Sequence, residues 1–261
     1  MSTPAAVRVW ESHFAIYKRI WRSNMLGSLF QPLLYLLGMG VGVGMLVDEG
    51  TASAEILGGV DYFAFLAPAL LATTAMIVVA QEAMWPVMDG FTWSNAFRAM
   101  AATPLRPADV AAGTGLWHAT RGALAAAGVA IVLALFPSTR SWGLLLAVPF
   151  ATLTGMAFAG PITAWSSTRV GGDQSFPAIM RFGIIPMFLF AGAFYPIEQL
   201  PDWLQPVARV TPLYHGVELC RGAVLGTLGV ADGVVHVAVL VVYWLAGFVI
   251  CRRTFARRLA T

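Results

Sequence analysis

Long stretches without a charged residue, recurring at the thickness of a lipid bilayer, are the feature that most constrains this chain. Four of them lie between these charged residues: Arg22 and Asp48, Asp61 and Glu82, Arg140 and Arg169, Asp232 and Arg252. Since about 20 apolar residues in a helix cross the hydrocarbon core, each stretch predicts a spanning helix. Only 11% of the residues are charged and 58% are hydrophobic, whereas soluble domains have about 25% charged residues. A water-soluble fold is therefore excluded.

Two further apolar runs, about residues 116–136 and 176–195, each hold one arginine near an end, where the long side chain can reach the headgroups. The sequence thus predicts an all-α integral membrane protein with a single domain over residues 1–261. The six predicted transmembrane helices cover about residues 25–47, 62–84, 114–136, 142–166, 176–195 and 233–251.

The basic residues predict the orientation, because Lys and Arg concentrate in short cytoplasmic segments. A cytoplasmic N-terminus leaves only Arg140, Arg209 and Arg221 outside and assigns the other basic clusters to the cytoplasm. Both termini are then predicted to be cytoplasmic in a multi-pass protein of the cell inner membrane, surrounded by lipids. The basic charge balance follows from this topology, so nucleic-acid binding is not needed to explain it.

A secretory signal is the competing interpretation of the N-terminus, because residues 52–54 resemble a cleavage site. The apolar run at 23–47 is longer than the usual core of 7–15 residues, which disfavours cleavage. Cys220 and Cys251 fall on opposite sides of the predicted membrane, so no disulfide and no metal site is expected.

Residues 5–24 predict a helix lying on the cytoplasmic interface. Trp10, Phe14, Tyr17 and Trp21 recur at helical spacing, with basic residues on the other side. A basic tail with chance aromatics is the alternative. In the first span, the small-xxx-small pairs Gly38–Gly42 and Gly40–Gly44 predict the close approach of another helix.

The segment 88–109 is the longest predicted cytoplasmic loop between spans. Phe91, Trp93, Phe97 and Met100 give it an apolar surface that is too large to leave in water. We therefore expect a soluble partner to cover it, and burial in the membrane surface is the alternative.

The segment 196–232 lies outside and predicts paired short re-entrant or interfacial helices between spans five and six. Pro201 can open the first, with Trp203 and Leu204 inside it. The second has Thr211 as its N-cap and Gly226 as its stop. Its apolar stripe is predicted to dip into the outer leaflet, while three polar side chains point away from that stripe: His215, Glu218 and Arg221.

Few ionisable residues lie within the predicted spans. Glu82 and Arg121 are the predicted intramembrane pair, with a structural role favoured over substrate handling; Arg181 and His236 receive no predicted role. Lys18, the single lysine, does not follow a glycine-rich loop, so the chain has no P-loop for ATP. No catalytic motif is present, and the chain is not expected to be an enzyme.

Two blocks of sequence resemble one transporter family. The run FLFAGAFYPIEQLPDWLQPVARVTPLYHGVELCRGAVLG, residues 188–226, resembles the signature of ABC-2 type exporter permeases, closest to the nodulation lipo-oligosaccharide and daunorubicin exporter branch. The run AATPLRPADVAAGTGLW, residues 101–117, is similar to the cytoplasmic loop of the same family. The resemblance implies two permeases, identical or related, and two separate ATPase subunits that bind ATP and Mg²⁺.

The resemblance also implies export of an amphipathic molecule such as a drug, glycolipid or lipid-linked saccharide. The alternative is a stand-alone ion-coupled carrier or membrane enzyme. A chain without an ATP site must receive work through a cytoplasmic contact, which points to these coupling residues: Asp89, Phe91, Phe97, Arg98 and Pro104. The predicted extracytoplasmic cap or gate comprises Glu198, Trp203, Tyr214, His215, Glu218 and Arg221.

Overall fold

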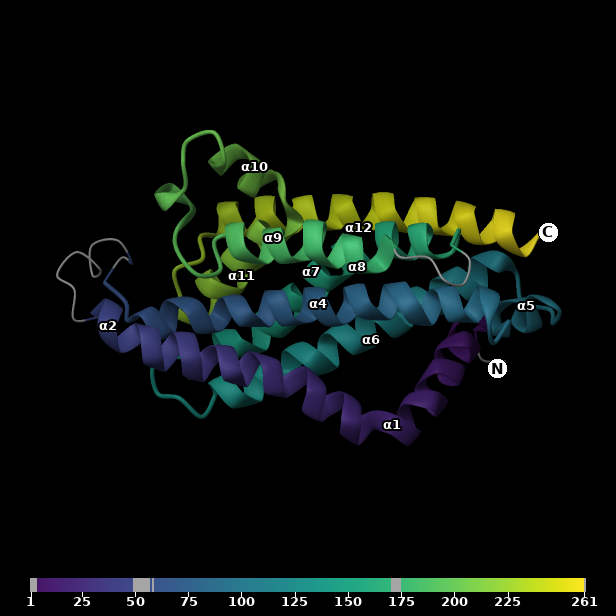
Figure 1. Ribbon diagram of the computed structural model, residues 1–261, viewed down its shortest axis with the longest axis horizontal. Coiled ribbons are helices and arrows are strands. Elements are labelled where there is room, and N and C mark those ends of the chain that lie inside the picture. Colours follow the sequence, from purple (N-terminus) through teal and green to yellow (C-terminus); the bar gives the residue numbers. More distant parts are fainter. Residues whose placement is uncertain (1–3, 49–56, 58, 170–174, 261) are drawn as a thin grey trace.

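The computed structural model describes residues 4–48, 57, 59–169 and 175–260. All regular structure in these ranges is helical. The two chain ends lie at the same end of the molecule as α5 (Ala96–Ala101), here called the terminal end. The opposite end, called the cap end, carries α2 (Gly44–Asp48), α10 (Gln205–Val210) and α11 (Pro212–Leu225) (Figure 1).

Among the described residues, five helical runs are long and apolar enough to cross a membrane. They are α4 (Tyr62–Thr92), α6 (Pro107–Leu133), α7 (Gly143–Ser166), α12 (Val230–Leu259) and the composite run Ala5–Asp48. These correspond to five of the six predicted spans, and α7 agrees with the predicted limits of 142–166 to within one residue.

The predicted fifth span is shorter than expected. It consists of α8 (Ser175–Ile179), the π-helical segment η2 (Met180–Ile184) and α9 (Ile185–Phe190), and it forms a short apolar helix. Residues 191–195, predicted to continue the span, form bends instead. Gly192 there has a φ of +79°, a left-handed backbone conformation that does not continue a helix. Glycine adopts this conformation readily because it has no Cβ.

The predicted interfacial helix and first span form one continuous helical run. α1 (Ala5–Tyr35) continues through the π-helical segment η1 (Leu36–Val43) into α2. Figure 1 shows that α1 turns sharply between two limbs. The first limb lies near the N-terminus and contains Trp10 and Tyr17, and the second limb contains Gln31 and Tyr35 and leads toward the cap end. The first limb packs on α6: Tyr17 is buried, and the Trp10 indole donates a hydrogen bond to Thr120 Oγ1 at 2.9 Å.

α4 lies in the interior and packs against α6, α7 and α11. α7 also packs along α12, and their backbones meet where Gly160 faces Gly247. A Cβ at Gly247 would lie 3.0 Å from the Cα of Gly160, so this approach requires glycine. The predicted close approach in the first span occurs at Gly40, against Phe63, and at Gly44, against Tyr62, whereas Gly38 has open space around it.

The cap helices differ from the prediction in one boundary. α11 begins and ends as predicted, since Thr211 Oγ1 accepts from the Tyr214 amide at 3.4 Å and Gly226 has a φ of +71°. The preceding helix, however, begins at Gln205, and Trp203 and Leu204 lie in the turn before it. A 3-10 turn, η3 (Ile197–Gln199), precedes that turn.

Candidate functional site

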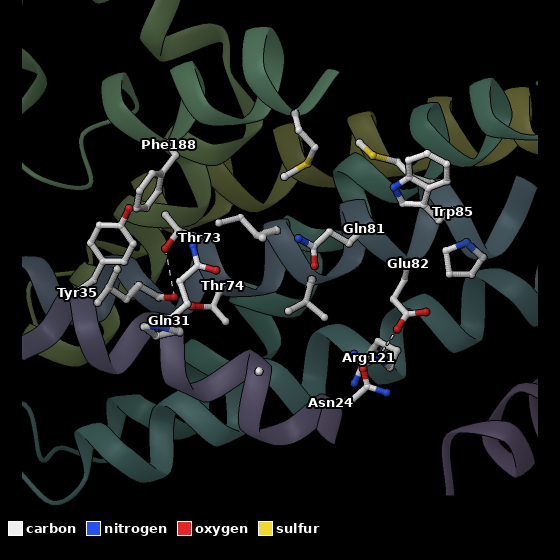
Figure 2. A pocket seen from close by; sticks show the side chains of 18 of the residues that line it. Asn24, Gln31, Tyr35, Thr73, Thr74, Gln81, Glu82, Trp85, Arg121 and Phe188 are labelled. Atoms are coloured by element: carbon white, nitrogen blue, oxygen red, sulfur yellow. Dashed lines mark hydrogen bonds and ion pairs between the residues drawn. The ribbon is translucent and has the colours of Figure 1, made fainter. Parts of the chain in front are cut away.

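A groove of about 600 Å³ opens beside α4, between the second limb of α1 and the segment that contains η2 and α9. Figure 2 shows side chains from these elements pointing into the same space. Three aromatic side chains, Tyr35, Trp85 and Phe188, line it together with a series of polar ones. A cavity of this size is typical of small-molecule sites.

The polar lining of this groove is largely uncharged. Hydroxyls and amides come from α1 and α4: Ser23, Asn24, Gln31, Thr73, Thr74 and Gln81. Gln31 and Gln81 are exposed in the single chain. In a helix of membrane length, an amide facing acyl chains lacks hydrogen-bond partners and costs several kcal/mol. These side chains therefore require water, a ligand or another polypeptide in the groove.

The one charged pair in the groove lining is Glu82 with Arg121. Arg121 Nε donates to Glu82 Oε1 at 2.6 Å, and the Trp117 indole donates to Oε2 at 3.4 Å. The Arg121 guanidinium also lies 4.8 Å from the ring centre of Tyr17. The pair expected from the sequence thus joins α4, α6 and the first limb of α1.

Pro86 explains why α6 supplies one more contact to Glu82. Proline has no amide hydrogen, so the Glu82 carbonyl, four residues earlier in α4, lacks its helical donor. The buried ring of His118 lies beside that carbonyl. Three residues of α6, Trp117, His118 and Arg121, therefore hold both the backbone and the side chain of Glu82.

An aromatic cluster joins the helices at the terminal end. The rings of Phe91 at the end of α4, Phe97 in α5 and Phe255 in α12 lie 4.9 to 5.4 Å apart, centre to centre. All three are essentially inaccessible, and Val9 of α1 belongs to the same core. This cluster connects the loop segment to three membrane-length runs.

The expectation that Phe91 and Phe97 stay exposed for a partner is wrong, because Phe255 and Val9 cover them within the chain. Phe91 also belongs to the last turn of α4, which extends to Thr92. Of the predicted coupling residues, Arg98 and Pro104 are exposed and Asp89 is half-buried; Trp93 beside them is also exposed. A partner protein would contact this outer surface.

The cap helix α11 packs into the protein. Its predicted apolar stripe is buried against α4 and α7, as Cys220 Sγ lies 3.5 Å from the Ala147 carbonyl and a Cβ at Gly216 would overlap Thr154. The stripe therefore contacts protein, and the insertion of α11 to the depth of the outer leaflet stays a prediction. His215 and Arg221 are also buried, at 8% exposure each, and Glu218 is half-buried.

Arg221 is the main polar link between the cap and the interior. Its guanidinium donates to Glu218 Oε1 at 2.8 Å, to the Phe65 carbonyl at 3.1 Å and to the Gly192 carbonyl at 2.7 Å. It also lies 3.7 Å from the ring centre of Phe65. α11 is thereby joined to α4 and to the bend after α9.

His215 forms a second link, to α12. Its Nδ1 lies 2.7 Å from Nδ1 of His236, and the backbone of Arg209 lies beside its ring. Burial, reinforced by the neighbouring His236, lowers the pKa of His215. Tyr214 stacks edge-on against both rings, whereas Trp203 is 72% exposed and Glu198 forms an exposed ion pair with Arg209 at 3.9 Å.

Comparison with known proteins defines the family. The family model described as ABC-2 type transporter matches residues 6–225, which cover the helices from α1 to α11 in the part of the chain that the structure describes, except the first residue of α1. The chain belongs to the ABC-2 type transporter family. ABC-2 proteins are membrane permeases without an ATPase domain of their own, and this chain is accordingly a multi-pass membrane protein.

Nodulation protein J of several rhizobia is similar over nearly the whole permease. The protein of Rhizobium leguminosarum bv. trifolii is 34% identical over 253 residues, covering 97% of this chain and 93% of that protein. The proteins of Rhizobium leguminosarum bv. viciae and Rhizobium meliloti are 32% and 31% identical, with 96% and 97% of this chain covered. The resemblance to ABC-2 permeases is thus confirmed.

Sequence reasoning missed several residues of this permease that the structure brings together. Trp117 and His118 lie on the Glu82 face of α6, and Phe255 completes the aromatic cluster. One feature of the sequence could have indicated the groove: Gln31 and Gln81 each interrupt an otherwise apolar stretch. Within the residues that the structure describes, no group of three metal-ligating side chains occurs.

Proposed function

We propose that this ABC-2 permease is the membrane-spanning subunit of an ATP-driven exporter of amphipathic molecules, such as a drug, glycolipid or lipid-linked saccharide. In this proposal the short helix Ser175–Phe190 is the fifth of six spans, and both termini of this inner-membrane protein lie in the cytoplasm. ATP and Mg²⁺ bind to a separate ATPase subunit, and a second permease, identical or related, completes the transporter.

The observation that carries the proposal is the polar, largely uncharged groove that opens beside the membrane-length helix α4. One wall is polar, with Gln31 and Gln81, while large apolar side chains are exposed on the neighbouring elements, as at Leu37 and Phe182. An amphipathic molecule matches both surfaces. A second permease placed against α1 and α9 would close the groove into a pathway and cover this apolar surface.

Coupling to ATP hydrolysis is assigned to the outer surface of residues 89–105. Arg98 and Trp93 are exposed there, and Phe97 fixes α5 against α4 and α12. A displacement of α5 by a bound ATPase is therefore transmitted through this packed aromatic core to α4, which forms one wall of the groove. Interfaces of this kind depend on a few anchoring residues, among which Arg and Trp are enriched.

The first test is purification of the tagged permease with the products of its neighbouring genes. We expect an ATPase to co-purify, and the reconstituted complex to transport only with hydrolysable ATP. Transport by the permease alone, driven by an ion gradient and insensitive to ATP depletion, would instead establish the stand-alone carrier.

The groove is tested separately by cysteine labelling in a background without Cys220 and Cys251. A cysteine at Gln81 should react with a membrane-impermeant maleimide. A cysteine at Ile131, which is 67% exposed on α6, should not, because lipid surrounds it. Equal protection of both positions would exclude a hydrated pathway at Gln81.

A further inference from the structure

A second groove, of about 620 Å³, lies on the outer face of the hairpin formed by α6 and α7 at the cap end. α6 lines it with Ala127 and Ala130, Ala134 follows in the turn after α6, and α7 lines it with Leu145 and Val148. The small alanine side chains leave the space between the two helices unfilled. Its lining is almost wholly apolar, so it suits a hydrocarbon chain.

Two residues of the connecting loop mark the rim of this lipid-facing groove: Arg140 and Trp142. Trp142 is 87% exposed, and exposed tryptophans are enriched at the headgroup level of membranes. The rim therefore belongs at the membrane interface, with the apolar groove directed into the hydrocarbon core.

Arg140 differs from the other arginines at the cap end. Arg209 pairs with Glu198 and Arg221 pairs with Glu218. Arg140 is exposed, and no carboxylate lies within 4.0 Å of it among the described residues. A guanidinium presents a planar fork of donors that matches phosphate oxygens. Among the described residues, the cation at the rim thus has no carboxylate counter-ion.

We propose that this groove binds one anionic phospholipid of the leaflet at the cap end. The phosphodiester is held by Arg140, one acyl chain lies along Ala127 and Ala134, and Trp142 lies beside the headgroup. This inference goes beyond the proposed transport function, because it depends on neither the exported substrate nor the ATPase.

The opposite side of the same hairpin supports the cap helix, which gives the lipid a structural consequence. Ser141 Oγ donates to the Val224 carbonyl at 2.8 Å, and Gly143 lies directly against the Ala223 carbonyl. Both contacts are to the last turn of α11. A lipid that orders the hairpin from outside therefore also stabilises the seat of α11.

The test is native mass spectrometry of the delipidated, purified permease titrated with dioleoyl phosphatidylglycerol or dioleoyl phosphatidylethanolamine. We expect one phosphatidylglycerol per chain to bind more tightly than further copies. Arg140→Gln should weaken it about tenfold, as expected for loss of a charge-assisted hydrogen bond, whereas Arg140→Lys retains most of the affinity. Arg209→Gln is the matched control and should bind like the parent.

Two further measurements separate the lipid from other sources of the same chemistry. Glycerol 3-phosphate at millimolar concentration should not displace the lipid, because it lacks the acyl chain, and Ala127→Phe should weaken binding by filling the groove. Equal binding of the two lipids, unchanged binding by Arg140→Gln or Ala127→Phe, or displacement by glycerol 3-phosphate would each overturn the proposal.

Discussion

Nδ1 of His215 and Nδ1 of His236 lie 2.7 Å apart, which allows one shared proton between the two rings and no more. The backbone of Arg209 also lies beside the His215 ring. A second proton would place two N–H groups against each other and separate α11 from α12. Tyr214, Glu218 and Arg221 of α11 and Tyr243 of α12 also lie in this region, together with the Arg209–Glu198 ion pair.

Acidification should therefore loosen the cap. The pKa of His215 is lowered from an ordinary value near 6.5, so the unfolded chain binds more protons than the folded one below that pH. Stability is complete above about pH 6.5 and falls as the pH decreases. The melting temperature, followed by tryptophan fluorescence at pH 7.5 and 5.5, should drop in the parent, and the drop should shrink in His215→Asn.

Tyr243→Phe is the control for that experiment. It removes another contact between α12 and the cap, the hydrogen bond of 2.9 Å to the Val210 carbonyl, without a group that titrates near pH 6. It should lower the melting temperature equally at both pH values. An identical pH response in His215→Asn and the parent would assign the effect to other groups.

Phe97→Ala and Arg98→Glu should fail in different ways. Phe97 is buried against Phe91 and Phe255, so its truncation should cost about 3–5 kcal/mol of stability. Arg98 is exposed, and its reversal should leave the melting temperature unchanged. We expect Phe97→Ala to reduce abundance and thermal stability, and Arg98→Glu to reduce co-purification of the ATPase and substrate-stimulated hydrolysis. If Arg98→Glu transports normally, Arg98 is not part of the coupling contact, and the contact would be assigned to the first limb of α1 instead.

The Glu82–Arg121 pair should show strong coupling in a double-mutant cycle. Removing either charge leaves the other one buried and unpaired, which costs about 3–5 kcal/mol. Glu82→Gln and Arg121→Met should therefore each destabilise the protein more than the double variant does. Denaturation midpoints of the four proteins in detergent measure the coupling. Additive losses would mean that the two side chains do not depend on each other.

Gly247→Ala should weaken the contact between α7 and α12. The added methyl meets Pro161 and the backbone of Gly160, and overpacking of this kind costs about 1–3 kcal/mol. Gly38→Ala is the matched control, since nothing lies within 4 Å of the added atom. A lower melting temperature is expected for Gly247→Ala only, and equal values for both variants would contradict the backbone contact.

Hydrophobic length and helix-end signals predicted much of the fold. The uncharged stretch before Arg169 predicted α7 to within one residue, and Thr211 and Gly226 marked the ends of α11 correctly. These signals are local, because a helix needs only its own residues to reach bilayer length or to be capped. The shortened segment before Ala191 was missed because apolar composition alone does not reveal a bend.

The candidate site depended on contacts between distant residues and was predicted less well. From the sequence alone, the aromatic residues at 91 and 97 could form either a partner-binding surface or part of a core. Phe255, which covers them in the structure, lies more than 150 positions away in the sequence. Glu82 and Arg121 were paired correctly because buried charges in membranes have few alternatives. Neutral amides such as Gln81 carry no such constraint, so the groove emerged only from the fold.

The acceptors of Arg221 are dispersed along the chain, from the Phe65 carbonyl, 156 positions earlier, to Glu218 in its own helix. During synthesis, therefore, the guanidinium has no complete set of partners until α4, the bend at Gly192 and α11 have come together. We expect α11 to remain in the headgroup layer until then and to enter the protein as a late step of biogenesis. Defects at Arg221 would accordingly appear first as retention by the insertion machinery and proteolytic clearance of the newly made chain.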